Sequence, residues 1–145
     1  MESLKIIRAD LSHIQLAVEA LQNVHGRKNV STSTTRAFLE RSENVLLLAC
    51  QGDQVIGSLN GYSLIHPDRS SPQFLLYEID VLPSFQNKGV GQTLVGAFID
   101  LARQYQAFEV WVLTNASNGS AMKMYQKCGF KRKNQDDVML NMMLE

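Results

Sequence analysis

The chain has 145 residues, of which 45% are hydrophobic and 19% charged, a composition typical of one globular domain. Its 14 basic and 14 acidic residues cancel, so no excess of positive charge indicates binding to nucleic acid or to an anionic membrane. No apolar run is long enough to cross a bilayer. We therefore expect a single domain over residues 1–145.

The N-terminus and the cysteines bear on location. No basic segment followed by an apolar core begins the chain, so we expect no signal peptide. Cys50 and Cys128 lie in apolar surroundings without the spacing of a metal-binding pair, and the three histidines are far apart. We expect a cytoplasmic protein without a metal site, although the sequence leaves a disulfide open.

The first half of the chain predicts a strand, a helix, a loop, a short helix and a hairpin. Asp10 or Ser12 is placed to cap the first helix, which Gly26 ends, and Gly52-Asp53 is a turn signal for the hairpin. The expected strand, loop, short helix and two hairpin strands span residues 4–8, 25–35, 35–41, 45–51 and 55–65.

The second half predicts a linker with two prolines, a strand, a long helix, a strand, a short helix and two closing strands. These span residues 66–72, 74–82, 92–104, 109–113, 118–127, 130–133 and 138–144. The order β-α-α-β-β-β-α-β-α-β-β predicts an α/β fold, a mixed sheet with helices on its faces. The order and direction of the strands do not follow from propensity.

A glycine-rich turn, Gln-Asn-Lys-Gly-Val-Gly at residues 86–91, joins the expected strand and the long helix. The first amides of a helix have no partner within it and carry partial positive charge, so such a turn can bind an anion. Gly89 and Gly91 would allow a phosphate to approach the backbone closely. For an isolated Gly-x-Gly an ordinary strand-to-helix turn is the better interpretation, and the Walker and Rossmann phosphate loops fit poorly.

Two carboxylates, Glu78 and Asp80, interrupt the otherwise apolar strand 74–82. Two residues apart on a strand without a bulge, they share one face. Because burying carboxylates is costly, their presence favours a functional site. For Asp80 the alternative is a structural partner to a backbone amide or a lysine.

The second half resembles the GNAT superfamily of acetyl-CoA-dependent N-acetyltransferases. Val81-x-Pro83 followed by Gln86-x-x-Gly89-x-Gly91 is similar to its main acetyl-CoA motif. Asn118-x-x-Ala121-x-x-x-Tyr125-x-x-x-Gly129-Phe130 is similar to its second motif. The resemblance spans roughly residues 55–130. It implies a GNAT-like fold, with a mostly antiparallel mixed sheet of about six or seven strands and about four helices.

A closer resemblance is to the aminoglycoside 3-N-acetyltransferases of this superfamily. It rests on Val55-Ile56-Gly57, Tyr62, a proline-containing loop, Leu76-Tyr77-Glu78-Ile79-Asp80-Val81 and Asp136-Asp137-Val138-Met139. Gln86 replaces the arginine common at its position, and Asp80 stands where this subfamily tends to have a small residue. The resemblance implies transfer of acetyl to an amine of an aminoglycoside, with antibiotic resistance as the consequence.

The resemblance also assigns residues to the coenzyme. These are Ile79, Val81, Gln86, Asn87, Lys88, Gly89, Val90, Gly91, Gln92, Thr93, Asn118, Ala121 and Tyr125. Tyr125 would protonate the leaving thiolate, and its alternative is a half-buried core tyrosine. Asn118 would contact the pantetheine arm, cap its helix, or do both. Lys88 is as readily interpreted as a solvated loop lysine.

Glu78 would be the base that takes the proton of the amine. With Asp80, Asp136 and Asp137 it would line an acidic cleft for a polycationic small-molecule acceptor, if the C-terminal hairpin folds over the strand end. For Asp136 and Asp137 the alternative is a solvated turn. We expect residues 25–35 to form the other wall. Acetylation of another small or peptide amine, and a non-catalytic acetyl-CoA-binding module, stay open, and members of the family are often dimers.

Overall fold

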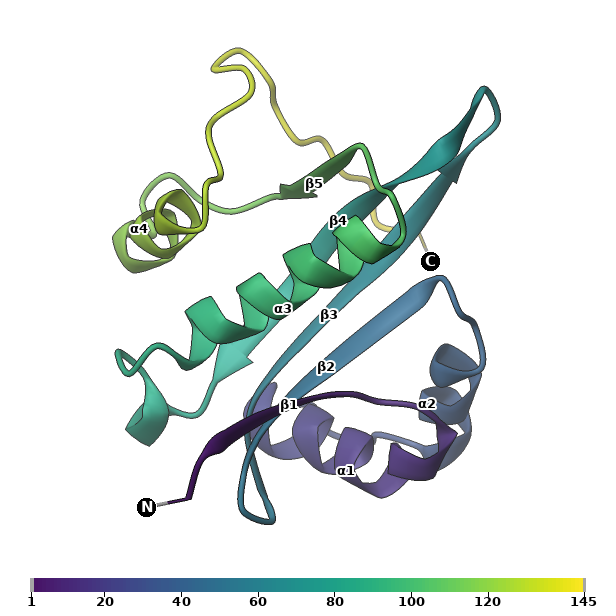
Figure 1. Ribbon diagram of the computed structural model, residues 1–145, viewed down its shortest axis with the longest axis vertical. Helices are drawn as coiled ribbons and strands as arrows, with labels where there is room; N and C mark the ends of the chain where they lie inside the picture. Colours follow the sequence, from purple (N-terminus) through teal and green to yellow (C-terminus); the bar gives the residue numbers. More distant parts are fainter. Residues whose placement is uncertain (1, 145) are drawn as a thin grey trace.

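The computed structural model describes residues 2–144, which form one sheet with helices on both faces (Figure 1). The strands are β1 (Leu4–Arg8), β2 (Asn44–Gln51), β3 (Gln54–His66), β4 (Arg69–Val81) and β5 (Glu109–Val112). The first helical segment consists of η1 (Leu11–His13), α1 (Ile14–Glu19) and η2 (Ala20–Val24). The others are α2 (Thr32–Leu39), η3 (Pro83–Phe85), α3 (Val90–Gln104) and α4 (Gly119–Lys127).

The sheet has the strand order β1-β2-β3-β4-β5, and all neighbours are antiparallel except β4 and β5, which run parallel. The prediction of a mixed, mostly antiparallel sheet flanked by helices is therefore confirmed. The predicted linker over residues 66–72 is wrong, because a tight turn joins His66 to Arg69 and Pro72 lies inside β4. Proline is tolerated there because the pairing of β3 with β4 is irregular near this turn.

Two apolar layers cover the sheet. On one face α3 packs against β1 to β4, and Leu94, Val95 and Phe98 are fully buried (Figure 1). On the other face η2 contacts β3 and α2 contacts β2, with Ala17 and Ala20 buried against the sheet. Residues 45–50 of β2 are all buried because both faces of this strand are covered.

A β-bulge lies in the middle of β4. Asn60 pairs with Glu78 and Gly61 pairs with Leu76, so Tyr77 is an extra residue on β4. Gly61 has no room for a side chain, since a Cβ would lie 2.5 Å from the Leu75 carbonyl oxygen and 2.6 Å from Phe98 Cζ. The pairing of β4 with β5 ends at Leu76, so the last five residues of β4 have no partner on that edge in the part of the chain that the structure describes. The bulge therefore marks the point where the two parallel strands part.

The C-terminal part differs from the sequence-based expectation. Neither of the closing strands predicted over residues 130–133 and 138–144 is present in the described chain, so the sheet has five strands rather than six or seven. The residues have strand-forming side chains, but a strand needs a partner edge, and this segment pairs with none within residues 2–144. No helix in residues 2–144 has the length and apolar character needed to pass through a membrane.

Candidate functional site

The glycine turn has the geometry expected of an anion site. β4 ends at Val81, η3 follows at once, and Gly89 is the N-cap residue of α3 with φ of 85°. This left-handed conformation suits glycine and exposes the first amides of a 15-residue helix. Asn87 is also left-handed, with φ of 59°. The Gln86 side chain fastens the turn to the strand by donating from Nε2 to the Val81 carbonyl oxygen at 2.9 Å.

A cleft of about 760 Å³ opens where β4 and β5 part, between the glycine turn and α4. The predicted site residues that line it are Glu78, Ile79, Asp80, Val81, Gln86, Asn87, Gly89, Val90, Gly91, Gln92, Asn118, Ala121 and Tyr125. Lys88 and Thr93 lie outside this lining. The Lys88 ammonium lies 5.7 Å from the centre of the Phe85 ring, and the Thr93 hydroxyl donates to the Gly89 carbonyl oxygen at 2.8 Å.

Tyr125 and Asn118 are positioned by α4. The Asn118 side chain caps this helix, because its Oδ1 accepts from the Ala121 amide at 3.3 Å. Tyr125 is 93% buried and packs edge-on against the Phe130 ring, yet it lines the cleft. Burial raises the pKa of the Tyr125 hydroxyl, and the negative charge of Asp80 adds to that shift. The hydroxyl is therefore kept protonated, as a proton donor requires.

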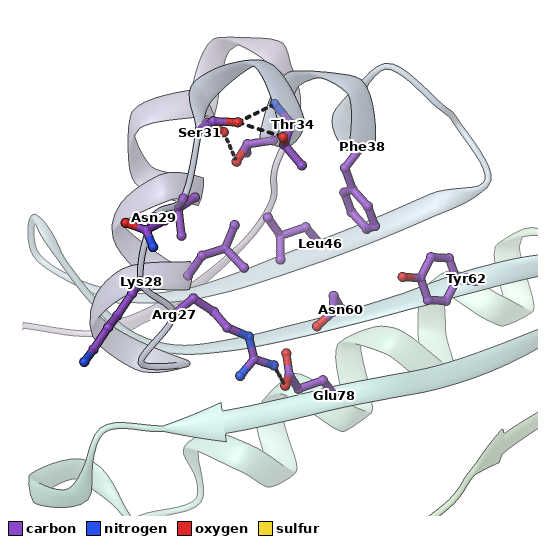
Figure 2. A pocket seen from close by; sticks show the side chains of 13 residues that line it. Arg27, Lys28, Asn29, Ser31, Thr34, Phe38, Leu46, Asn60, Tyr62 and Glu78 are labelled. Carbon is purple, nitrogen blue, oxygen red and sulfur yellow. Dashed lines mark hydrogen bonds and ion pairs between the residues drawn. The ribbon is translucent and has the colours of Figure 1, made fainter. Parts of the chain in front are cut away.

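Glu78 and Asp80 do share one face of β4, because the bulge at Tyr77 precedes both of them. They converge on His25, which follows η2. His25 Nδ1 lies 2.7 Å from Asp80 Oδ2 and 3.5 Å from Glu78 Oε1. The other oxygen of Glu78 forms an ion pair with the Arg27 guanidinium, as Figure 2 shows. Two carboxylates near the cleft are thus held by two basic side chains from one turn.

The His25 side chain is fully buried, whereas the side chains of Glu78 and Asp80 are 25% and 50% exposed. A short contact between an imidazole nitrogen and a carboxylate requires a proton on that nitrogen, which assigns the proton to Nδ1. Nε2 has no hydrogen-bond partner in the described structure. Ligand atoms of all three residues lie within 4.8 Å of one another, but the Arg27 guanidinium on Glu78 repels a dication.

A smaller pocket of about 310 Å³ also reaches Glu78, which lines both cavities (Figure 2). Residues 27–31 and α2 form one wall, and β2 and β3 contribute Leu46, Asn60 and Tyr62. This pocket places residues 27–31 beside Glu78, and the expectation that residues 25–35 form the other wall of an acidic acceptor cleft stays a prediction. Arg27 and Lys28 also place positive charge on this wall, which the sequence analysis did not anticipate.

Asp136 and Asp137 do not join the other two carboxylates. Both are exposed, and the Asp136 amide donates to Asn134 Oδ1 at 2.8 Å in a local turn. Asp137 lines a different groove, beside β5. The expectation that they face the end of β4 depended on a C-terminal hairpin, and that hairpin is absent from the described residues. The solvated turn was the better interpretation.

The sequence analysis placed residues 25–35 in a wall of the cleft but did not identify His25 or Arg27 as site residues. His25 sits directly before Gly26, whose φ of 66° ends the first helical segment. Nothing in the local sequence distinguishes it from a histidine at any helix end. Its partners are more than 50 residues away on β4, so only the packing of η2 against β3 brings them together.

Comparison with known proteins gives a family. A family model described as the acetyltransferase (GNAT) family matches residues 13–130. The chain is 27% identical over 131 residues to a mycothiol acetyltransferase of Renibacterium salmoninarum, a match over 85% of this chain and 38% of that protein. It is 31% identical over 127 residues to the Kocuria rhizophila protein of the same name, over 86% of this chain and 40% of that protein. The chain thus spans about two fifths of the length of these curated relatives.

Solved structures confirm the fold. An aminoglycoside acetyltransferase from an uncultured soil metagenomic sample, in complex with sisomicin, superposes with a TM-score of 0.86. It is 20% identical, and the match covers 98% of this chain and 97% of that one. An aminoglycoside N-acetyltransferase in complex with CoA gives a TM-score of 0.76 at 19% identity, over 97% of this chain and 96% of that one.

Proposed function

Because the chain belongs to the acetyltransferase (GNAT) family, we propose that it transfers the acetyl group of acetyl-CoA directly to a primary amine in a ternary complex. One observation carries this proposal. A single cleft is lined by an exposed helix N-terminus, a carboxylate and a buried tyrosine whose pKa is raised. Anion binding, proton removal and proton donation are the three tasks that this transfer requires.

The coenzyme has a place in the cleft. We assign its pyrophosphate to the amides at the start of α3, where Gly89 and Gly91 leave the backbone accessible. Its pantetheine arm would enter where β4 and β5 part, pairing with free backbone groups near Ile79 and Val81 as an added strand would. The thioester would then lie between Glu78 and Tyr125, which line the same cleft.

The reaction follows from these positions. Glu78 accepts a proton from the ammonium form of the acceptor, directly or through a water, and the free amine attacks the thioester carbonyl carbon. The carbon–sulfur bond then breaks, Tyr125 donates its proton to the departing thiolate, and the second proton that the acylated nitrogen loses restores the Tyr125 hydroxyl, directly or through a water. The ion pair with Arg27 orients the Glu78 carboxylate, and His25 Nδ1 lies 3.5 Å from its other oxygen.

For the acceptor we propose first an aminoglycoside, with its 3-amino group as the nucleophile. Support comes from Glu78 and Asp80, which place two carboxylates beside the cleft, where they would attract an ammonium-rich substrate. A second candidate is an amine that also carries an anionic group, such as an amino acid or a peptide. Arg27 and Lys28 on the wall of the smaller pocket favour this candidate.

The decisive experiment is acetyl-CoA turnover against aminoglycosides, polyamines, amino acids and peptides, with release of free thiol as the readout. Glu78→Gln should lower turnover on the best acceptor by about 10²-fold or more while leaving acetyl-CoA affinity unchanged. Asp100→Asn is the matched control, since it also removes a carboxylate paired with an arginine, on the exposed surface of α3. Equal turnover of the two variants would contradict the role of Glu78.

Turnover of neutral peptide amines without turnover of any aminoglycoside would overturn the aminoglycoside assignment and leave the acetyltransferase assignment in place. No turnover with any amine, together with tight acetyl-CoA binding, would instead identify a coenzyme-binding module that does not catalyse transfer.

A further inference from the structure

His25 lies behind the two carboxylates and not in the cleft itself. Its side chain is fully buried, and it lines neither the cleft nor the smaller pocket, whereas Glu78 and Asp80 both line the cleft. It is the residue after η2, and the packing of η2 against β3 brings it to this face of the sheet. A side chain so placed does not touch an acceptor, so any part that it has in the transfer acts through the carboxylates.

The two carboxylates are held by different groups. Glu78 has the Arg27 guanidinium on one oxygen, and His25 Nδ1 is 3.5 Å from the other. Among residues 2–144, Asp80 forms no ion pair with a lysine or an arginine, and its one side-chain hydrogen bond is to His25 Nδ1, 2.7 Å from its Oδ2. At these distances the Nδ1–H group donates to Asp80.

The neighbouring strand does not duplicate this bond. Ser58 is the residue of β3 that pairs with Asp80, and its hydroxyl is buried without a hydrogen-bond partner in the described chain. The Asp80 side chain is 50% exposed, so without His25 it could adopt several rotamers in solvent. The bond from His25 therefore fixes the direction in which this carboxylate points.

We propose that His25 is a positioning residue for acceptor binding: through Nδ1 it holds the Asp80 carboxylate in place as the anchor for an ammonium group of the acceptor. This inference rests on the proposed acetyl transfer. Arg27 already neutralises Glu78, which leaves Asp80 as the one of the two carboxylates whose charge no lysine or arginine of the described chain cancels. An ammonium at Asp80 is on the same face of β4 as Glu78, the group that takes its proton.

The direction of the Asp80 carboxylate also matters for the proposed proton donor. Burial raises the pKa of the Tyr125 hydroxyl, and the negative charge of Asp80 raises it further, so the field of this carboxylate reaches Tyr125. Turning Asp80 away would displace a bound ammonium relative to both Glu78 and Tyr125. A small misplacement of a reactant is costly, and this gives a buried residue behind the site an effect on the reaction.

The two ring nitrogens of His25 have unequal roles. Nε2 is buried and bonds to no group in the described structure, so only Nδ1 acts. The side-chain amide nitrogen of asparagine can take the place of Nδ1, whereas that of glutamine reaches the place of Nε2. His25→Asn should therefore keep the bond to Asp80, and His25→Gln and His25→Leu should lose it. If the ring only filled space, the two larger side chains would instead be tolerated better than asparagine.

Calorimetry of amine binding in the presence of coenzyme A tests this proposal without requiring turnover. The probes are sisomicin, spermidine, phenylalanine and alanylalanine, and the one that the wild type binds most tightly is measured with each variant. His25→Leu and His25→Gln should weaken its binding about 10-fold or more, as loss of a hydrogen bond to a charged group does. His25→Asn should recover most of this loss, and the affinity for coenzyme A should be the same in all three variants.

His13→Leu is the matched control. His13 Nδ1 also lies close to an aspartate, 3.1 Å from Asp10 Oδ1, but at the start of the first helical segment and outside both cavities. This variant should bind the amine as the wild type does. Circular dichroism establishes that the variants fold. In the wild type itself, the Nδ1 proton of His25 should be visible in ¹H–¹⁵N NMR spectra and should shift when the amine binds, and an amine that binds without shifting it would overturn the proposal.

The outcomes separate the role of His25 from acetyl transfer. An amine that shows the expected ranking of variants but is never acetylated would contradict the proposed transfer and support the role of His25. Acetylation of an amine that the wild type and His25→Leu bind equally tightly would overturn this role and leave the transfer in place. Tighter binding by His25→Gln than by His25→Asn, or binding of none of the four amines by the wild type, would overturn it as well.

Discussion

Replacing Gly61 by alanine tests whether the bulge in β4 organises the site. The added Cβ would lie 2.5 Å from the Leu75 carbonyl oxygen and 2.6 Å from Phe98 Cζ, both below the 3.0 Å that real Cβ contacts respect. The carbonyl belongs to the backbone of β4 and cannot yield without moving the strand. Phe98 is fully buried, and its ring centre lies 5.3 Å from that of Phe74, so it has no free space to enter.

Overpacking a core in this way costs about 1–3 kcal/mol, and a clash with backbone belongs at the upper end of that range. For a chain of this size a loss of about 3 kcal/mol lowers Tm by roughly 6–12 °C. The matched control is Gly96→Ala in the middle of α3, where nothing lies within 4 Å of the new Cβ. It should instead stabilise by about 0.5–1 kcal/mol, because glycine is a poor helix former.

Differential scanning calorimetry of the two variants measures both effects. Opposite signs are expected, with acetyl-CoA affinity reduced only in Gly61→Ala, because moving the bulge shifts the strand that borders the cleft. Gly61→Ala with a Tm equal to or above that of the wild type would refute the assignment of the bulge. Phe98→Leu added to Gly61→Ala should recover part of the loss by removing one of the two clashes.

Three further predictions concern the site. Gly89→Glu should abolish acetyl-CoA binding in calorimetry, because it places a negative charge at the proposed phosphate site. Gly89→Gln has the same backbone strain at φ of 85° but no charge, so it should weaken binding less. Equal affinities of the two variants would show that an anion does not bind at this turn. Asp80→Asn should raise the KM of a polycationic acceptor, while Asp136→Asn/Asp137→Asn should not, and the reverse result would show that the C-terminal carboxylates reach the acceptor. Tyr125→Phe should lower the rate about 10²-fold and also alter the stability of the protein at alkaline pH. Burial raises the pKa of Tyr125 above 10.0 in the folded state, so the unfolded chain loses this proton first and stability falls as pH rises above 10. Tyr125→Phe should flatten that decline in denaturation curves, and an unchanged decline would count against the shift.

Local sequence patterns predicted most of the fold because most elements have local causes. Asp10 caps the first helical segment through Ser12, Gly52 turns the β2–β3 hairpin, and Asn118 caps α4, each as its residue type suggests. The glycine turn and its helix were predicted for the same reason. The helix boundaries differ by a few residues, since α2 begins at Thr32 with Ser31 as its cap and α3 begins at Val90.

The errors arose where structure depends on distant partners. Residues 138–144 have the composition of a strand, but no pattern within them shows whether an edge is available in the same chain. The bulge at Tyr77 is invisible for the same reason, because it is defined by the register against Asn60 and Gly61. The interaction of His25 with Glu78 and Asp80 likewise depends on packing across the sheet.

The bulge and the free edge of β5 are two consequences of one geometry. Parting β4 from β5 after Leu76 opens the cleft, but within residues 2–144 it leaves β5 only four paired residues and no neighbour on its other side. A strand so short contributes little stability of its own, and β5 is nevertheless one wall of the proposed coenzyme site. Acetyl-CoA that contacts this wall should therefore slow amide hydrogen exchange in β5, and hydrogen-exchange measurements would refute this link by finding equal rates with and without the coenzyme.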